Sequence, residues 1–425
     1  MSPFALDFIK GLFSAERGHR NIERICEKLP DNSYSKLQHF ISESPWDAFA
    51  VMQKVANDSH ELYKNFGSVG LIIDESAEEK KGTHSVGVAP QYCGNKGKLA
   101  NCQVAVFGCL AAGKYANLID TRLYLPSEWT SDRKRCKLAG VPKDRWEFKK
   151  KTELALQIVR DQRKAGIGFD WVGADAFYGN DSWFLKELDK DGELFVIDVH
   201  KDQVVYLEAP VIAVPEKQGT KGRNPKLLKA DSTGIEIGKY YESLRSKDWK
   251  KVKLRDGTKG ELISQVHVKK VFTWNKVDQT ACERLLIIRK TKKGKKSEIK
   301  FALSNAQEGK FTMQELAQMQ SQRFWIENSL KESKHHIGMY EYQVRGWRAW
   351  HHHIALSMMA TYFMQSERIL YQNELPLLSC NDIRATLLHT YASDAISDEQ
   401  FMQILKARHE RRKKDIDLNY KKSTS

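Results

Sequence analysis

Residues 70–74 read Gly-Leu-Ile-Ile-Asp, and residues 171–175 read Trp-Val-Gly-Ala-Asp. Each stretch is an apolar run that stops at an aspartate, a pattern typical of a buried strand that ends there. Around them the sequence predicts strands at 69–73, 103–111, 115–125, 169–174 and 194–199, and helices at 145–164 and 182–188. This order predicts an α/β fold whose mixed sheet carries helices on its faces and gathers ligands at the carboxyl ends of its strands.

The segments outside this pattern have a different periodicity. Residues 3–66 have helical spacing, and Ser44 is predicted to cap a helix with Pro45 at its first position. After residue 200, strands are predicted at 235–241, 262–274, 284–290 and 298–304. Helical spacing returns near residue 313 and continues to about 369, and a last helical stretch at 382–408 precedes a charged tail.

The chain is strongly basic. Its 425 residues include 69 Lys and Arg against 54 Asp and Glu, a formal net charge of +15, and 41% of them are hydrophobic. The hydrophobic fraction excludes a largely disordered basic protein. The charge points to nucleic acid or an anionic membrane as partner, with a merely solvated basic surface as the alternative. Basic residues concentrate in the N-terminal helices, in loops at 217–229 and 290–296, and in the tail, where they either contact a nucleic-acid backbone or are simply exposed.

Cysteine usage and hydropathy bear on the compartment. The seven cysteines are scattered and none belongs to a Cys-x-x-Cys pair, which favours a reducing compartment over a disulfide framework or zinc ribbon. The chain does not open on a secretory signal, and apolar runs such as 354–364 are too short to span a bilayer. We therefore expect a cytoplasmic protein without a membrane partner.

Two aspartates are candidates for a shared site. Asp74 and Asp175 both follow apolar strands, and two strands of one sheet can bring such residues together across a hundred residues of sequence. Paired carboxylates are the oxygen ligands that Mg²⁺ prefers. The alternative is that either aspartate only caps a turn or helix.

A third carboxylate lies on a predicted helix. Glu327 shares one helix face with basic residues four positions before it and four and seven positions after it, namely Arg323, Lys331 and Lys334. A carboxylate among cations suits a site that holds metal ions against phosphates. The alternative is a solvated helix with ordinary ion pairs.

At this point the sequence resembles the DDE transposases of bacterial insertion sequences, in the subgroup with a strand-rich domain inserted before the catalytic glutamate. The resemblance covers roughly residues 5–370. The matching motifs are Leu71-Ile-Ile-Asp74-Glu, Lys81-Gly-Thr-His-Ser-Val-Gly-Val-Ala-Pro-Gln-Tyr-Cys-Gly94, Gly173-Ala-Asp175-Ala-Phe-Tyr-Gly179, and Arg323-x₃-Glu327-x₆-Lys334 leading into Tyr342-Gln-Val-Arg345-Gly-Trp347.

The resemblance implies a catalytic domain of the RNase H type. Asp74, Asp175 and Glu327 are expected to be the catalytic and metal-binding triad, holding two Mg²⁺ ions for which Mn²⁺ can substitute. The residues expected to bind DNA are Arg323, Lys331, Lys334, Arg345, Lys80 and Lys81. The implied partners are transposon-end DNA, target DNA and a second copy of the chain in a synaptic complex, in a bacterial, nucleoid-associated setting.

Motifs and periodicity together predict five segments. They are a helical DNA-binding domain (1–66), a first part of the RNase H-like core (67–200), a β-rich insertion (201–310), a second part of the core with the glutamate helix (311–370), and a C-terminal helical region with a basic tail (371–425). In the insertion, Trp249 and Trp274 are either core residues or platforms for a flipped base.

The implied function is binding of terminal inverted repeats followed by metal-dependent end cleavage and strand transfer. The alternatives are a catalytically inactive or domesticated DNA-binding derivative and another RNase H-like nuclease. One departure from the family signature is Gln320, which stands three residues before the arginine where relatives carry tyrosine.

Overall fold

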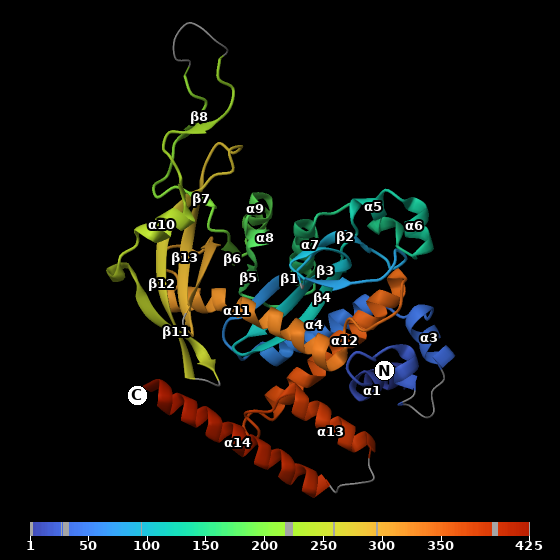
Figure 1. Ribbon diagram of the computed structural model, residues 1–425. Helices are drawn as coiled ribbons and strands as arrows, with labels where there is room; N and C mark the ends of the chain where they lie inside the picture. Colours follow the sequence, from blue (N-terminus) through green and yellow to red (C-terminus); the bar gives the residue numbers. More distant parts are fainter. Residues whose placement is uncertain are drawn as a thin grey trace. The chain divides into compact units, whose positions relative to one another are not determined.

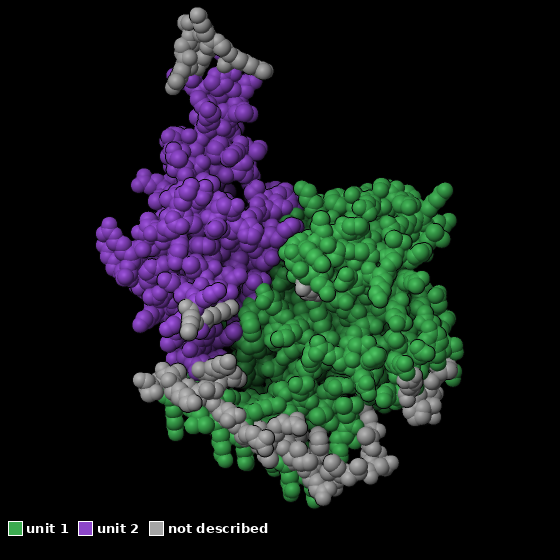
Figure 2. Space-filling model, viewed as in Figure 1, with its two compact units in different colours: residues 1–169, 324–425 green, residues 170–323 purple. Residues whose placement is uncertain are grey.

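The computed structural model describes residues 3–26, 28, 34–94, 96–216, 224–257, 260–294, 296–392 and 398–424. It forms two compact units, coloured separately in Figure 2: unit 1 comprises Met1–Phe169 with Phe324–Ser425, and unit 2 comprises Asp170–Arg323. The predicted α/β class with a mixed sheet is confirmed. Most of the basic loop predicted at 217–229 lies outside the described residues.

Unit 1 is built on an antiparallel sheet. Its strands are β1 (Val69–Glu79), β2 (Ala89–Cys93), β3 (Lys98–Ala112) and β4 (Tyr115–Leu123). The long strand β3 pairs with each of the other three. Every residue of β4 is buried, which requires cover on both faces of the sheet. Helix α7 (Lys151–Lys164) packs against β3, whereas α4 (Ala48–Tyr63) packs against β4.

Helix α12 (Trp347–Leu370) is central to unit 1, and most of its residues are buried. Figure 1 shows the first helices and α13 beside it, and their apolar residues form one core with those of α12. No helix in the described part of the chain combines the length and apolarity needed to cross a membrane. Further helices of unit 1 are α1 (Pro3–Ser14), α2 (Ile22–Cys26), α3 (Tyr34–Ser42), α5 (Ser127–Thr130), α6 (Arg133–Leu138), η1 (Lys143–Arg145), α13 (Cys380–Ala392) and α14 (Asp398–Thr424).

Unit 2 contains the parallel part of the sheet. Strand β5 (Trp171–Ala174) runs parallel to β6 (Phe195–Val199), and β6 pairs antiparallel with β14 (Lys296–Ser304). The sheet continues through antiparallel β13 (Cys282–Lys293), β12 (Gly260–Thr273) and β11 (Lys250–Gly257). Its shorter elements are α8 (Ala176–Gly179), α9 (Ser182–Lys190), β7 (Val204–Val205), β8 (Ile212–Ala213), β9 (Lys229–Ala230), β10 (Ile235–Glu236), α10 (Ile237–Ser243) and η2 (Ser246–Asp248). Trp249 is partly buried and packs against the apolar cluster around β13 and β14.

Several predicted elements differ from the structure. The strand predicted at 235–241 is mostly helix α10, because Ile237, Tyr240, Tyr241 and Leu244 have helical spacing and together cover one apolar cluster. The cap of α4 is Asp47 and not Ser44, since the Asp47 carboxylate accepts the backbone N–H groups of Phe49 and Ala50. The helix predicted at 145–164 begins only at Lys151, and the one predicted at 382–408 is two helices, of which α14 runs on through the charged tail.

Three consecutive histidines near the start of α12 are buried. His351 Nδ1 lies 2.8 Å from the carbonyl oxygen of Trp347, and His353 Nε2 lies 3.1 Å from that of Met339. The His352 ring stacks on Trp46 with 3.7 Å between ring centroids. Burial lowers the pKa of His351 to about 3 and that of His353 to about 4. The folded state therefore needs these rings neutral.

Close packing leaves no room for a side chain at Gly179, the last residue of the Asp175 motif. A Cβ added at Gly179 would lie 2.0 Å from the carbonyl oxygen of Asp198 on β6. We therefore expect Gly179→Ala to destabilise unit 2 by about 1–3 kcal/mol, the usual cost of forced overpacking. Gly94 has nothing within 4 Å of such a Cβ, so Gly94→Ala is the matched control. The measurement is the urea unfolding midpoint, and equal midpoints for the two variants would contradict the packing argument.

The buried histidines predict a loss of stability in mild acid. Their folded pKa values lie below the ordinary value of about 6.5, so stability is complete above that pH and falls as the pH drops toward 4. Each histidine contributes up to about 1.4 kcal/mol per pH unit in this window. The free energy of unfolding of His351→Gln should therefore vary less between pH 6.5 and 4.5 than that of the parent. Parallel curves in urea titrations at several pH values would show that His351 does not stay neutral on folding.

Candidate active site

Asp74 lies in the middle of β1 and is 9% exposed. Its Oδ1 accepts the backbone N–H of Glu75 at 2.8 Å. The prediction that the strand ends at Asp74 is wrong, because β1 continues to Glu79. Strand β3 is long enough to pair with β1 along its whole length, from Val69 opposite Ala112 to Glu79 opposite Cys102. The pairing with β3 thus extends for five residues on either side of Asp74 and fixes its backbone.

The structure brings Lys334 close to Asp74. Lys334 lies in a π-helical turn, η3 (Ser333–Ile337), that follows the glutamate helix α11 (Met313–Glu332). Burial lowers the pKa of Lys334, while the charges of Glu78 and Asp74 oppose this shift. Its ammonium nitrogen lies 4.8 Å from the ring centroid of Tyr340. The π turn interrupts the α-helical spacing on which the predicted common face of Glu327 and Lys334 depended, and such turns are frequent at functional sites.

Glu327 and Lys331 lie on the exposed side of α11. The opposite side is buried through Ile326 and Leu330. Ser329, also buried, places its hydroxyl 3.4 Å from the carbonyl oxygen of Ala116 on β4. Glu327 and Lys331 thus share one exposed face, as predicted, and the buried face opposite holds this half of the helix against the sheet of unit 1.

The first half of α11 belongs to unit 2 and carries a buried polar network. Arg323 Nε lies 3.3 Å from Oδ2 of Asp198 on β6, and the Gln320 amide donates to Oδ1 of Asp198 at 3.0 Å. The Gln320 oxygen accepts the Arg289 Nε–H at 3.3 Å. Burial raises the pKa of Asp198, and the neighbouring Arg323 is the strongest opposing influence. Gln320 thus joins a buried carboxylate to a buried guanidinium, which is its structural role.

Asp175 follows β5 directly and caps α8. Its Oδ1 accepts the backbone N–H of Phe177 at 3.0 Å, and its side chain is partly exposed. The cap uses one carboxylate oxygen, so the second remains available for another ligand. The approach of Asp175 to Asp74 and Glu327 stays a prediction of the sequence motif.

Three of the expected DNA-binding residues line one cavity of unit 1. Lys80, Lys81 and Arg345 belong to a cavity of about 540 Å³ between the N-terminal helices, the segment after β1 and the segment before α12. The Lys80 ammonium lies 3.7 Å from the ring centroid of Tyr342. Burial lowers the pKa of Lys80 to about 8. Lys81 and Arg345 are exposed.

The donor chemistry of the expected triad suits a hard divalent ion, since carboxylate oxygens are the ligands of Mg²⁺ and Mn²⁺. The Lys334 ammonium interacts electrostatically with Asp74, so a metal ion at this carboxylate would compete with that cation. Among the residues that the structure describes, no three acidic, imidazole or thiol side chains converge into one metal-binding group. The assignment of the triad therefore rests on the donor chemistry and the motifs.

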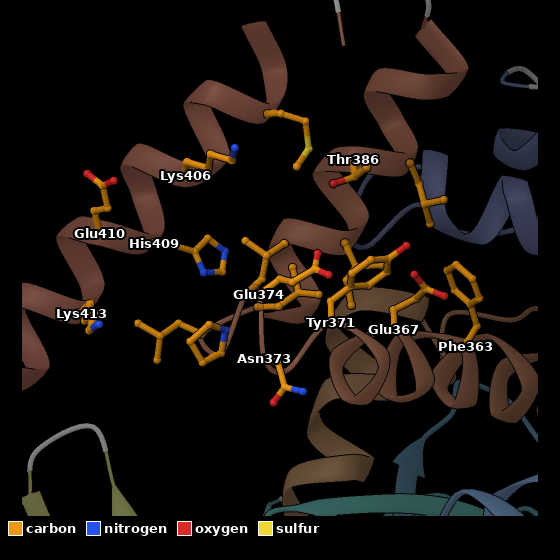
Figure 3. A pocket seen from close by; sticks show the side chains of 17 residues that line it. Phe363, Glu367, Tyr371, Asn373, Glu374, Thr386, Lys406, His409, Glu410 and Lys413 are labelled. Atoms are coloured by element: carbon orange, nitrogen blue, oxygen red, sulfur yellow. The ribbon is translucent and has the colours of Figure 1, made fainter. Parts of the chain in front are cut away.

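A larger cavity of about 840 Å³ lies between the end of α12, α13 and α14. Figure 3 shows Lys406, His409 and Lys413 on one helix facing Tyr371 and Glu374. No residue singled out by the motifs lines this cavity, so its size does not make it the active site.

The sequence of this chain is similar to those of known proteins. A family model for the DDE superfamily endonucleases matches residues 3–261, more than half of the chain. The chain belongs to this family. A probable transposase for insertion sequence element IS701 from Microchaete diplosiphon is 29% identical over 194 residues, which cover 44% of this chain and 46% of that relative. The matched segment thus spans about half the length of the relative. The match to the family model includes Asp74 and Asp175, whereas Glu327 lies beyond it.

The sequence reasoning missed Asp198, the centre of the network on α11. The signal was present, because Asp198 interrupts the otherwise apolar run Phe195–Val199, and a carboxylate inside a buried strand needs partners. Those partners, Gln320 and Arg323, lie more than a hundred residues away in the sequence.

The network predicts the cost of removing Gln320. Gln320→Leu leaves Asp198 and Arg289 each without one hydrogen-bond partner, so we expect a loss of about 1–3 kcal/mol of unfolding free energy. Gln314 is exposed on the same helix, and Gln314→Leu should stay within about 0.5 kcal/mol of the parent. Urea denaturation measures both variants. A Gln320→Leu variant as stable as its control would mean that the amide does not bridge the two charges.

Proposed function

We propose that the chain is a DNA transposase that binds the terminal inverted repeats of its element and catalyses end cleavage and strand transfer. The observation that carries the proposal is the family match, which includes an aspartate fixed in the buried strand β1 and a second one directly after β5. The similarity to the probable IS701 transposase supports it. A basic chain of this charge also suits a polyanionic substrate.

Asp74, Asp175 and Glu327 are the proposed metal ligands. Two Mg²⁺ ions, or Mn²⁺ in their place, would activate the attacking water or 3′-hydroxyl and stabilise the leaving oxygen. The protein's part is to hold the carboxylates: pairing with β3 fixes Asp74, the α8 cap orients Asp175, and the packing of α11 directs Glu327 away from its buried face.

The proposed DNA contacts are the six basic residues of the motifs. Lys81, Lys331 and Arg345 are exposed and suited to phosphate contacts, which position a duplex without reading its sequence. Arg323 and Lys334 lie beside carboxylates, and Lys80 lines the 540 Å³ cavity. We also propose that the five predicted segments act as domains and that two copies of the chain join the two ends in a synaptic complex.

The test is an end-cleavage assay with the purified chain, a duplex carrying the terminal repeat of its own element, and Mg²⁺. Asp74→Asn, Asp175→Asn and Glu327→Gln should each lower the cleavage rate at least about 100-fold, more than the loss caused by changing a mere partner of a metal ligand. Asp202 is exposed, so Asp202→Asn serves as the matched control and should cleave like the parent.

The alternatives give different results in the same assay. A parent protein that binds the ends but leaves them uncut, like its Asp175→Asn variant, is a DNA-binding derivative without catalysis. Triad-dependent cutting of any duplex, with no preference for the ends, indicates a general nuclease of the same fold.

A further inference from the structure

The 540 Å³ cavity of unit 1 is built from three parts of the chain that are far apart in the sequence. Its lining includes Tyr34 and Gln38 on α3, Lys80 and Lys81 after β1, and Tyr342 and Arg345 before α12. The volume is within the range of pockets that hold one small organic ligand, roughly 300–1,000 Å³. The lining is polar and basic, which suits an anionic ligand with hydrogen-bonding groups.

The cavity has a net positive lining. Lys80, Lys81 and Arg345 contribute three cations, and Glu23 is the acidic residue of the wall. Arg20 also lines the cavity, but its guanidinium is paired with Glu341 at 2.8 Å and does not add to the surplus. Three cations around a space of this size match a phosphate group.

The floor of the cavity is rigid. The hydroxyl of the buried Tyr342 donates to Gln103 at 2.9 Å and accepts the indole N–H of Trp350 at 2.9 Å. The Lys80 ammonium lies over this fixed ring, 3.7 Å from its centroid. A cation held in this way is pre-organised for a ligand, because it loses little further freedom on binding.

Hydrogen bonds also hold the loop that carries Lys80 and Lys81 in place. Asn101 on β3 donates from its amide to the carbonyl oxygens of Lys80 and Gly82, at 2.7 and 2.8 Å. The N–H of Val86 donates to the carbonyl oxygen of Arg345 at 2.9 Å. The segments that supply Lys80, Lys81 and Arg345 are therefore tied to the sheet and to each other.

Helix α3 contributes an aromatic side chain, Tyr34, to the cavity lining. Tyr34 lines the cavity and is 54% exposed, so about half of its surface remains accessible to a ligand. Exposed aromatic rings beside basic grooves are stacking platforms for the bases of single strands.

We propose that this cavity holds one unstacked nucleotide of a DNA strand, with its phosphate among Lys80, Lys81 and Arg345 and its base against Tyr34. This inference rests on the proposed function for the nature of the polymer. Lys80 lies six residues after Asp74, which is roughly 20 Å along an extended strand. The nucleotide bound here is therefore distinct from the one that reacts, and it sets the position of the DNA relative to β1.

The experiment measures binding in the absence of catalysis. The full chain is titrated against a fluorescein-labelled 12-mer of thymidylate in EDTA, and anisotropy is followed at several salt concentrations. Lys80→Met, Lys81→Met and Arg345→Met should each weaken binding and lower the slope of log K against log salt by about 0.7, the release of one phosphate's counterions from a single strand. Tyr34→Ala should weaken binding about 5- to 150-fold at an unchanged slope, because stacking is not electrostatic.

Matched controls separate the cavity from the surface at large. Lys114 and Tyr371 are exposed in unit 1 outside this cavity, so Lys114→Met and Tyr371→Ala should bind like the parent. A second readout uses 5-iodo-deoxyuridine in the 12-mer, whose photo-crosslink should map to the peptide that contains Tyr34. Cavity variants that match the controls, or a crosslink confined to other peptides, would overturn the proposal.

Failure of this proposal can be told from failure of the proposed function. A parent that cleaves its element's ends, combined with cavity variants that bind like the controls, removes the nucleotide site and leaves the transposase. A parent that cuts no end, combined with the predicted loss of binding and slope in the cavity variants, leaves a nucleotide site in a protein that only binds DNA.

Discussion

Burial of α12 is the constraint on which unit 1 depends. A helix that is buried on nearly all sides needs neighbours all round it, and these are the N-terminal helices, α4, β4 and α13. Burial lowers the pKa of two of its histidines, His351 and His353, so the folded protein favours their neutral form. Because α1, α2 and α3 share this core, the basic residues that they carry are fixed relative to the strand with Asp74.

The connection between α11 and α12 contacts the N-terminal helices and carries residues of both proposed sites. Gly338 adopts φ +72, and a Cβ there would lie 2.7 Å from the Arg20 side chain. Glu341 accepts from the guanidinium and the backbone N–H of Arg20 and from the N–H of Gly18, so it clamps the N-terminal helices to this connection. The same connection carries Lys334 to Asp74 and places Tyr342 in the neighbouring cavity. One short segment thus connects Asp74, a proposed metal ligand, with the proposed nucleotide site.

What the sequence could predict was local. Apolar runs located β1, β5 and β6, and the cap residue Asp175 follows from its place after a strand. The length of β1 could not be predicted, because the residues beyond Asp74 are strand only through their pairing with β3. Segment 235–241 was misassigned because its helical spacing covers just two turns. The pairing of Arg323 with Asp198, and the packing of the first helices on α12, join residues that only the folded chain brings together.

Five of the six expected DNA-binding cations fall into two physical classes. Lys81, Lys331 and Arg345 are exposed, and exposed cations attract any polyanion with a strength that salt screens. Arg323 is paired with the Asp198 carboxylate, and the Lys334 ammonium is influenced by the charges of Glu78 and Asp74. A phosphate must compete with these internal partners, so such cations contribute little to loose encounter and most to a complex whose geometry rearranges the charges around the site. A surplus of positive charge alone would bind DNA anywhere; cations held beside acids favour the complex in which the DNA is correctly placed.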